Sequence, residues 1–450
     1  RAETKPVELS EYQTFLIGLQ GVGPVGGERY DGEDGVMRVI EQLEGVALPP
    51  SVWESSVLPA RVRDYRPAML DGLLSSGEIV WVGSKTTGSK AKEPGLVALH
   101  PADSLLLTVQ DGEKNGEAPG EPVTLPDAVM AVLAPGGAYH ANQLAGLTRA
   151  AWDASSECVD ESTGEILPHP WSDSQFEEAL WSLVWQGKVT NSSFDPLRSL
   201  GASSHAVKAP ARASRRRVRV RVSVPANMTG LWSAVPHADM QEASAERVAI
   251  ARIEALLDRY GVIAPPMIDK ERLDGGFSGL YPVLRRMEEH GALMRGMFVS
   301  GCGAAQFASR QTVDALRACA AEPSAVVLDA TDPANLYGSV IAWPRTIGGV
   351  SIRPARRSGA SVVLRGGRLL AYAVPRSHHL LLAQDADPAL QQACNELAYA
   401  LQRNLRDGGI RGGVTFCDAN DEPLTVRGEW SRMLHVAGFV PVPQGMRLYC

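Results

Sequence analysis

The chain contains 450 residues, of which 44% are hydrophobic and 21% are charged. This composition provides enough apolar surface for packed cores and excludes a bulk disordered chain. At about 150 residues per domain, the length predicts roughly three domains or several smaller modules. No apolar run reaches the roughly 18 residues that a transmembrane helix needs, so we expect no membrane partner.

The ends, charge and cysteines of the chain set further limits. The formal net charge is −7, so the molecule as a whole is not a polycation. Arg1 stands at the start in place of Met and no apolar signal segment follows, so we expect a piece of a longer cytoplasmic protein. None of the six cysteines has the C-x-x-C spacing, and no His lies at a zinc-finger offset, so no metal site is predicted.

One local pattern occurs three times along the chain. A helical segment ends at a glycine, at Gly77, Gly187 and Gly291, and a short strand follows at once. Glycine readily supplies the left-handed residue that ends a helix. An amphipathic segment precedes each unit, at residues 36–45, 125–133 and 246–260. Helix, turn, helix, glycine and strand is the order of a winged helix, although helix–glycine–strand also occurs in other mixed folds.

The remaining segments predict strands and a few helices. Residues 217–224 alternate arginine with valine, which predicts a strand with one basic face. Short strands at 350–353, 360–365 and 368–374 predict a small barrel or sheet, followed by a helix at 388–407. We therefore expect an α+β fold, with tandem winged-helix modules followed by a small β-barrel-like module. The expected modules are residues 1–120, 121–225, 226–330 and 331–450.

Positive charge is concentrated in two stretches that contain no acid, residues 208–221 and 335–376. Planar guanidinium groups suit phosphate oxygens, so these stretches predict contact with a nucleic-acid backbone. The alternatives are a solvated face, or pairing with carboxylates of another domain or subunit. The predicted contacts are Arg215, Arg216, Arg217, Arg219, Arg221, Arg345, Arg353, Arg356, Arg357, Arg365 and Arg368. Trp232 and Trp343 are candidate stacking platforms for unpaired bases, or core residues.

Short segments spread over most of the chain share a family resemblance. They are GVALP at 45–49, LPARVRDY at 58–65, GEIVWVG at 77–83, LVWQG at 183–187, GAAQFA at 303–308, LDATDPAN at 328–335, GFV at 438–440 and GMRL at 445–448. Together they resemble the C-terminal region of Lhr, the large helicase-related proteins. Lhr proteins are similar to superfamily 2 helicases that track along single-stranded DNA.

The resemblance implies a bacterial DNA-repair helicase whose motor lies upstream. The chain has no P-loop of its own, so ATP and magnesium would bind in that motor and no cofactor is expected here. The expected partners are DNA, single-stranded or as a tailed duplex, the upstream helicase core, and further copies of the chain. The architecture also resembles the AlkZ/YcaQ DNA glycosylases.

Catalytic residues transfer poorly from those glycosylases. Neither Gln-x-Gln nor Gln-x-Asp occurs, and the related pattern Gln42-Leu43-Glu44 is expected on the polar face of a helix. Asp329 and Asp332 form the best local candidate, because carboxylates activate water and stabilise a cationic sugar. The alternative is a turn or helix cap. His378 and His379 are expected on opposite faces of a strand and so in no shared site.

Three functions follow from these observations. The first is a DNA-binding accessory region of a repair helicase. The second is a DNA glycosylase that hydrolyses the N-glycosidic bond of uracil or an alkylated base. The third is an interaction scaffold in which the arginines pair between subunits.

Overall fold

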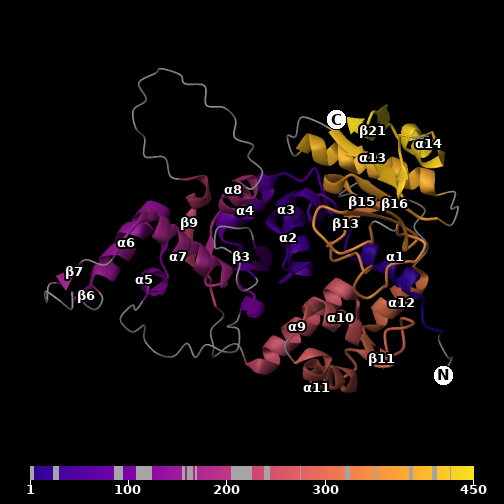
Figure 1. Cartoon of the computed structure of the whole chain (residues 1–450). Coiled ribbons are helices and arrows are strands. Elements are labelled where there is room, and N and C mark those ends of the chain that lie inside the picture. Colours follow the sequence, from indigo (N-terminus) through magenta and orange to yellow (C-terminus); the bar gives the residue numbers. More distant parts are fainter. Residues whose placement is uncertain are drawn as a thin grey trace. The chain divides into compact units, whose positions relative to one another are not determined.

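We analysed a computed structural model of the whole chain (Figure 1). It describes residues 5–23, 30–85, 95–107, 124–154, 158–159, 166–167, 170–203, 225–237, 244–273, 275–319, 325–349, 352–384, 389–407, 413–425 and 427–449. The chain forms two compact units. Unit 1 contains residues 1–43, 52–65 and 245–450, and unit 2 contains residues 44–51 and 66–244.

Unit 2 begins with the first repeated pattern. Helix α4 (Pro67–Ser76) ends at Gly77, whose φ of 79° is left-handed, and the hairpin of β3 (Ile79–Ser84) and β4 (Leu96–Pro101) follows. Leu48 bridges to Val97 on the free side of β4. The short 3-10 helix η2 (Leu105–Leu107) comes next.

The second pattern of unit 2 is a complete winged helix by its topology. Its elements are α5 (Leu125–Leu133), β5 (Ala138–His140), α6 (Ala141–Ala154), α7 (Asp173–Trp185), β8 (Val189–Asn191) and β9 (Leu231–Ala234). The sheet order β5-β9-β8 places the last strand in the middle, as a wing requires. The additional elements are β6 (Cys158–Val159), β7 (Ile166–Leu167), α8 (Asp195–Ser203) and η3 (Ala226–Met228).

Unit 1 contains the third pattern, with the same topology. Its elements are α9 (Ala245–Tyr260), β10 (Val262–Ile263), α10 (Pro265–Glu271), α11 (Gly276–Glu289), β11 (Met294–Gly296), β12 (Gln306–Ala308) and α12 (Arg310–Ala318). The sheet order is β10-β12-β11. Gly187 and Gly291, which follow α7 and α11, have φ values of 73° and 78°. The three predicted left-handed glycines are therefore confirmed.

The N-terminal part of unit 1 contributes mostly helices. Its elements are α1 (Leu9–Leu19), β1 (Tyr30–Asp31), α2 (Gly32–Gln42), the π-helix η1 (Trp53–Val57) and β2 (Val62–Arg63). Strands β1 and β2 pair in parallel. The short helix α3 (Pro50–Val52) directly precedes η1.

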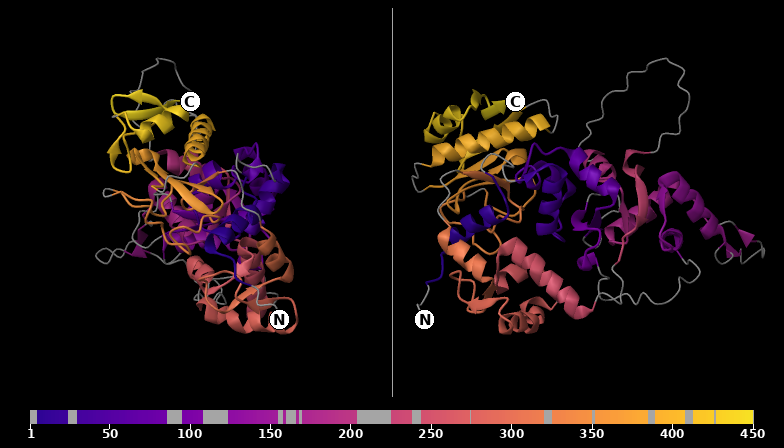
Figure 2. Two further views of the ribbon diagram at one scale, coloured as in Figure 1. Left: turned by 90° about the vertical axis from the view of Figure 1, so that its right-hand side faces the viewer. Right: turned by 180° about the vertical axis from the view of Figure 1, so that it is seen from behind.

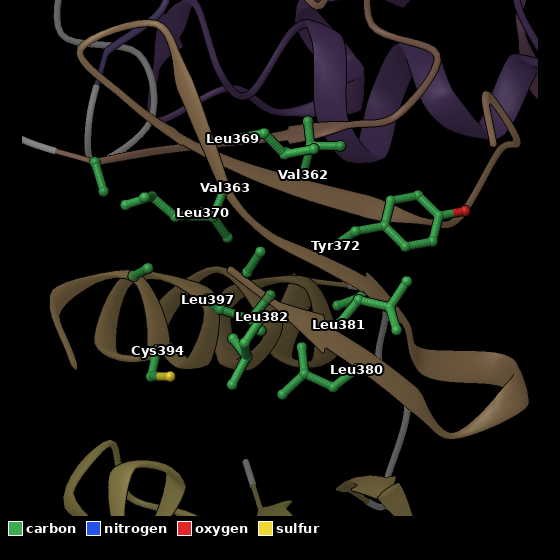
Figure 3. Packing of buried hydrophobic residues seen from close by; sticks show 14 of the residues in the cluster. Val362, Val363, Leu369, Leu370, Tyr372, Leu380, Leu381, Leu382, Cys394 and Leu397 are labelled. Atoms are coloured by element: carbon green, nitrogen blue, oxygen red, sulfur yellow. The ribbon is translucent and has the colours of Figure 1, made fainter. Parts of the chain in front are cut away.

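The C-terminal part of unit 1 is built on an open sheet. Its order is β13-β14-β15-β16-β18-β19, with β13 (Val326–Asp329), β14 (Ser361–Arg365), β15 (Arg368–Val374), β16 (His379–Leu382), β18 (Asp418–Ala419) and β19 (Glu422–Pro423). Helix α13 (Leu390–Asp407) packs against β13, β14 and β15, as the views in Figure 2 also show. Leu382 of β16 lies beside Leu397 of α13 in this core, and Leu380 lies farther along the same strand (Figure 3).

A second small sheet completes this part of unit 1. It has the order β17-β21-β20, with β17 (Gly413–Phe416), β20 (Val440–Val442) and β21 (Gly445–Tyr449). Helix α14 (Glu429–Val436) packs against α13, and η4 (Pro375–Ser377) joins β15 to β16.

The expected β-barrel-like module is therefore wrong, whereas the mixed fold with winged helices is confirmed. Within the described residues, β13 and β19 remain the two edges of the large sheet and do not pair with each other. A helix covers one face of the sheet, which buries that face without closure. Residues 352–353 lie outside any strand, and the predicted basic strand at 217–224 lies outside the described residues. The four module boundaries stay a prediction.

Candidate functional site

Asp332, one of the two predicted catalytic acids, is fully buried in unit 1. Its carboxylate forms a two-point ion pair with Arg61, with nitrogen–oxygen distances of 2.8 and 3.0 Å. Both side chains have 0% exposure. Arg61 also donates to Val57 O (3.0 Å) and to Gln20 Oε1 (2.9 Å), while Asp332 accepts from Ala334 N–H. The pair joins the end of η1 to the loop that follows β13.

Asp329, the second predicted acid, closes the same loop. Its Oδ1 accepts from Thr331 N–H at 2.8 Å, and its Oδ2 accepts from Gly359 N–H at 2.8 Å. Burial raises the pKa of Asp329, and the hydrogen bonds from Thr331 and Gly359 oppose that rise. These are the contacts of an Asx-type turn. The structure thus places both acids in a buried turn, and their catalytic role stays a prediction.

Two cations line the outside of this loop. Arg356 donates to four main-chain carbonyls, those of Thr331, Asp332, Asn335 and Tyr337. Lys270 of α10 donates to Pro333 O at 2.8 Å, and its Nζ lies 5.2 Å from the centre of the Tyr260 ring. Burial, together with the charge of Arg356, lowers the pKa of Lys270 to about 7. Arg356, predicted to contact phosphate, is thus engaged by the loop's own carbonyls.

The other predicted arginines fall into two groups. Arg345, Arg353, Arg357 and Arg368 are exposed, and Arg365 is half-buried at the β14–β15 turn. Arg357 Nε donates to the Tyr372 hydroxyl at 3.0 Å. The second group, Arg215, Arg216, Arg217, Arg219 and Arg221, lies outside the described residues. The convergence of the two basic stretches on one surface therefore stays a prediction.

The two tryptophans have different surroundings. Trp232 has 0% exposure and packs edge-on against Trp181, with ring centres 5.5 Å apart. The prediction of a stacking platform at Trp232 is therefore wrong, because a base cannot reach a ring that fills a core. Trp343 is half-buried, stacks on Tyr337 at 6.1 Å and meets Tyr372 edge-on at 5.7 Å. Its role in stacking stays a prediction.

The third helices of the winged modules carry little free positive charge. On α11, Arg285 pairs with Glu289 and Arg286 pairs with Glu246 of α9. On α7, Asp173 and Glu178 are exposed. Neither helix therefore presents the unpaired basic face that commonly contacts phosphates in the winged-helix mode.

The adjacent histidines have separate partners, as predicted. His378 has a left-handed φ of 64°, and its Nδ1 lies 2.8 Å from Thr415 O. His379 begins β16, and its Nδ1 lies 2.7 Å from Asp418 Oδ2. Asp418 comes 39 residues later on another strand, so no local pattern in the sequence pointed to this pair.

Sequence reasoning missed the buried polar residues that surround Asp332. Gln13 donates to Ala334 O at 2.6 Å and accepts from Leu336 N–H, and Gln20 bonds Arg61. Gln42, expected on a polar surface, is buried and donates to the carbonyls of Leu19 and Asp258. The one available signal was a charged residue, Arg61, inside an otherwise apolar run.

Comparisons with known proteins identify the modules. Residues 7–102 and 242–327 each match a family described as large helicase-related protein, winged-helix domain. The chain is 37% identical over 480 residues to "Lhr helicase/uracil glycosylase" of Escherichia coli. It is 37% identical over 473 residues to "Lhr helicase/ probable uracil glycosylase" of Mycolicibacterium smegmatis. These matches cover 99% and 100% of the chain and 29% of each relative.

A solved structure shares the fold. It is the DNA glycosylase AlkZ of Streptomyces sahachiroi, with a TM-score of 0.50 and 14% identity, over 92% of this chain and 99% of that one. At this identity the likeness concerns the fold alone. The resemblance predicted from the sequence is confirmed: the chain carries two winged-helix domains of the Lhr family and is similar over its length to one part of Lhr-type proteins.

Proposed function

We propose that this chain is the DNA-binding C-terminal region of a Lhr-type repair helicase, whose ATP- and magnesium-dependent motor precedes it. The observation that carries the proposal is the set of exposed arginines in the acid-free stretch 335–376. Among the described residues, Arg345 and Arg353 form no ion pair, unlike Arg285 and Arg286 of the third winged helix. Such unpaired guanidinium groups suit a phosphate backbone.

The test compares two arginine pairs. The R345A/R353A variant should bind a single-stranded oligonucleotide more weakly than the wild-type chain. The slope of log affinity against log salt should fall by roughly 0.7 for each phosphate that is no longer neutralised. The matched control is R285A/R286A, whose side chains are already neutralised and whose removal should change the slope little. An unchanged slope in R345A/R353A would remove these arginines from the DNA interface.

A second function is favoured by the names of the relatives, which both contain uracil glycosylase. We propose that the chain also hydrolyses the N-glycosidic bond of deoxyuridine in single-stranded or tailed DNA. The test is to incubate the chain with a uracil-containing oligonucleotide and to measure alkali-labile abasic sites. Absence of cleavage would exclude this activity.

No helix within the described residues is long and apolar enough to cross a membrane.

A further inference from the structure

A histidine and an aspartate face each other on the large sheet of unit 1. His379 in β16 and Asp418 in β18 are direct partners in a parallel ladder. Their side chains make an Nδ1–Oδ2 contact of 2.7 Å. The two backbones are held by the sheet and not by a loop, so the pair is positioned rigidly.

The pair leaves one ring nitrogen available for chemistry. A carboxylate at Nδ1 accepts the Nδ1–H, so the neutral imidazole carries its lone pair on Nε2. Among the described residues, Nε2 has no hydrogen-bond partner. The His379 side chain is 30% exposed and the Asp418 side chain 21% exposed. Solvent therefore reaches the pair, whereas the other His–carboxylate pair, His100–Glu44, is only 10% and 11% exposed.

The sheet face that carries the pair also carries an aromatic residue. His379 is the partner of Val374, and Leu381 is the partner of Tyr372, so all four side chains lie on one face. Tyr372 lies about 7 Å along the strand and about 5 Å across the ladder from His379. Its hydroxyl accepts from exposed Arg357, and Trp343 packs against its ring. The ring of Tyr372 is itself buried, so on this face a DNA strand can reach the half-buried His379–Asp418 pair and the exposed Arg357.

We propose that His379 is the general base of uracil excision and that Asp418 positions it; this inference rests on the proposed glycosylase function. His379 Nε2 takes a proton from water as the water oxygen bonds to C1′ of the deoxyribose. The C1′–N1 bond breaks, and its electron pair leaves on N1 of uracil. The imidazolium proton then neutralises the uracil anion, so that water is divided between the sugar and the base. In this proposal Asp329 and Asp332 stay engaged in the buried turn and take no part in the step.

The experiment compares three variants of the full chain by single-turnover excision and by equilibrium binding of the same uracil-containing oligonucleotide. H379Q should lower the rate at least about 100-fold, the size expected of general base catalysis, with DNA affinity unchanged. D418N should lower the rate less, again with DNA affinity unchanged, because an amide can still hold the ring by a hydrogen bond but carries no negative charge to stabilise the imidazolium. H378Q is the matched control, since Nδ1 of His378 lies against the Thr415 carbonyl and not against a carboxylate, and it should retain the wild-type rate.

The outcomes separate this inference from the function on which it rests. If the wild-type chain excises uracil and folded H379Q does so at a similar rate, the pair is not the base and the glycosylase function stands. If H379Q does not fold, D418N decides, and a wild-type excision rate in folded D418N overturns the role of the pair. If the wild-type chain excises nothing, both proposals fail.

Discussion

Replacing Asp332 by Asn tests whether the buried ion pair is structural. Asn keeps the size of the side chain and removes the charge that neutralises Arg61, both residues being fully buried. Breaking one partner of a buried pair leaves an uncompensated charge and costs about 3–5 kcal/mol. Four segments meet at this pair and its neighbours, namely α1, η1, α9 and the loop after β13. We therefore expect D332N to loosen unit 1 as a whole.

Hydrogen exchange followed by mass spectrometry is the suitable assay. A chain with two compact units need not unfold in one step, and exchange reports each segment separately. Peptides covering residues 9–19 and 329–337 should lose protection in D332N, while peptides of α5 and α7 in unit 2 serve as internal references. The control is R38M, which breaks the Arg38–Asp258 pair at 39% and 36% exposure and should cost at most about 1 kcal/mol.

The same variant distinguishes a structural from a catalytic Asp332. A catalytic carboxylate can be replaced by its amide with little loss of stability. If D332N kept the protection of residues 329–337 and lost uracil excision, the structural role would be refuted and Asp332 would return as the catalytic acid. Loss of protection with excision retained at low temperature would support the structural role.

Three further predictions concern stability. The folded state lowers the pKa of Lys270 from 10.5 to about 7, so between these pH values the unfolded chain binds more protons than the folded chain. The contribution of Lys270 to the free energy of unfolding therefore rises with pH across that window. K270M should flatten this rise, as measured by urea titrations at several pH values. G367A should destabilise unit 1 far more than G359A in thermal melts. Both glycines have a left-handed φ, but of the two only Gly367 has a backbone atom, the Ser10 carbonyl oxygen, where an added Cβ would lie. W232A should cost about 3–5 kcal/mol, seen as reduced exchange protection in α7, and equal protection would contradict the core assignment.

Local signals sufficed to predict the winged helices. Gly77, Gly187 and Gly291 each follow a helix and precede a strand, and such a glycine acts on its neighbours alone. The prediction of a barrel was wrong because barrel closure depends on segments that are distant in the sequence. Closure depends on whether β13 meets β19, which are about 90 residues apart, and on whether a helix covers the sheet instead. Neither condition can be recognised from the sequence of a single segment.

The candidate site shows the same division between local and distant information. The turn at Asp329 was available as an alternative because Asp-x-x-Asp-Pro is a local pattern. The partner of Asp332 was not, since Arg61 is 271 residues away. His379 and Asp418 likewise come together only through the register of β16 with β18. The residue pairs that form the candidate site are therefore set by the topology of the fold and not by local sequence patterns.

Charge distinguishes the winged-helix parts of this protein from the C-terminal part of unit 1, which we propose to contact DNA. The arginines of α11 are paired with glutamates, and α7 exposes acids, so these helices are poor phosphate contacts. The acid-free stretch 335–376 instead places Arg345, Arg353 and Arg357 in the C-terminal part of unit 1, the part that contains the half-buried His379–Asp418 pair. Phosphate contacts and the proposed general base in the same part of unit 1 would hold a DNA strand where a uracil is excised from it.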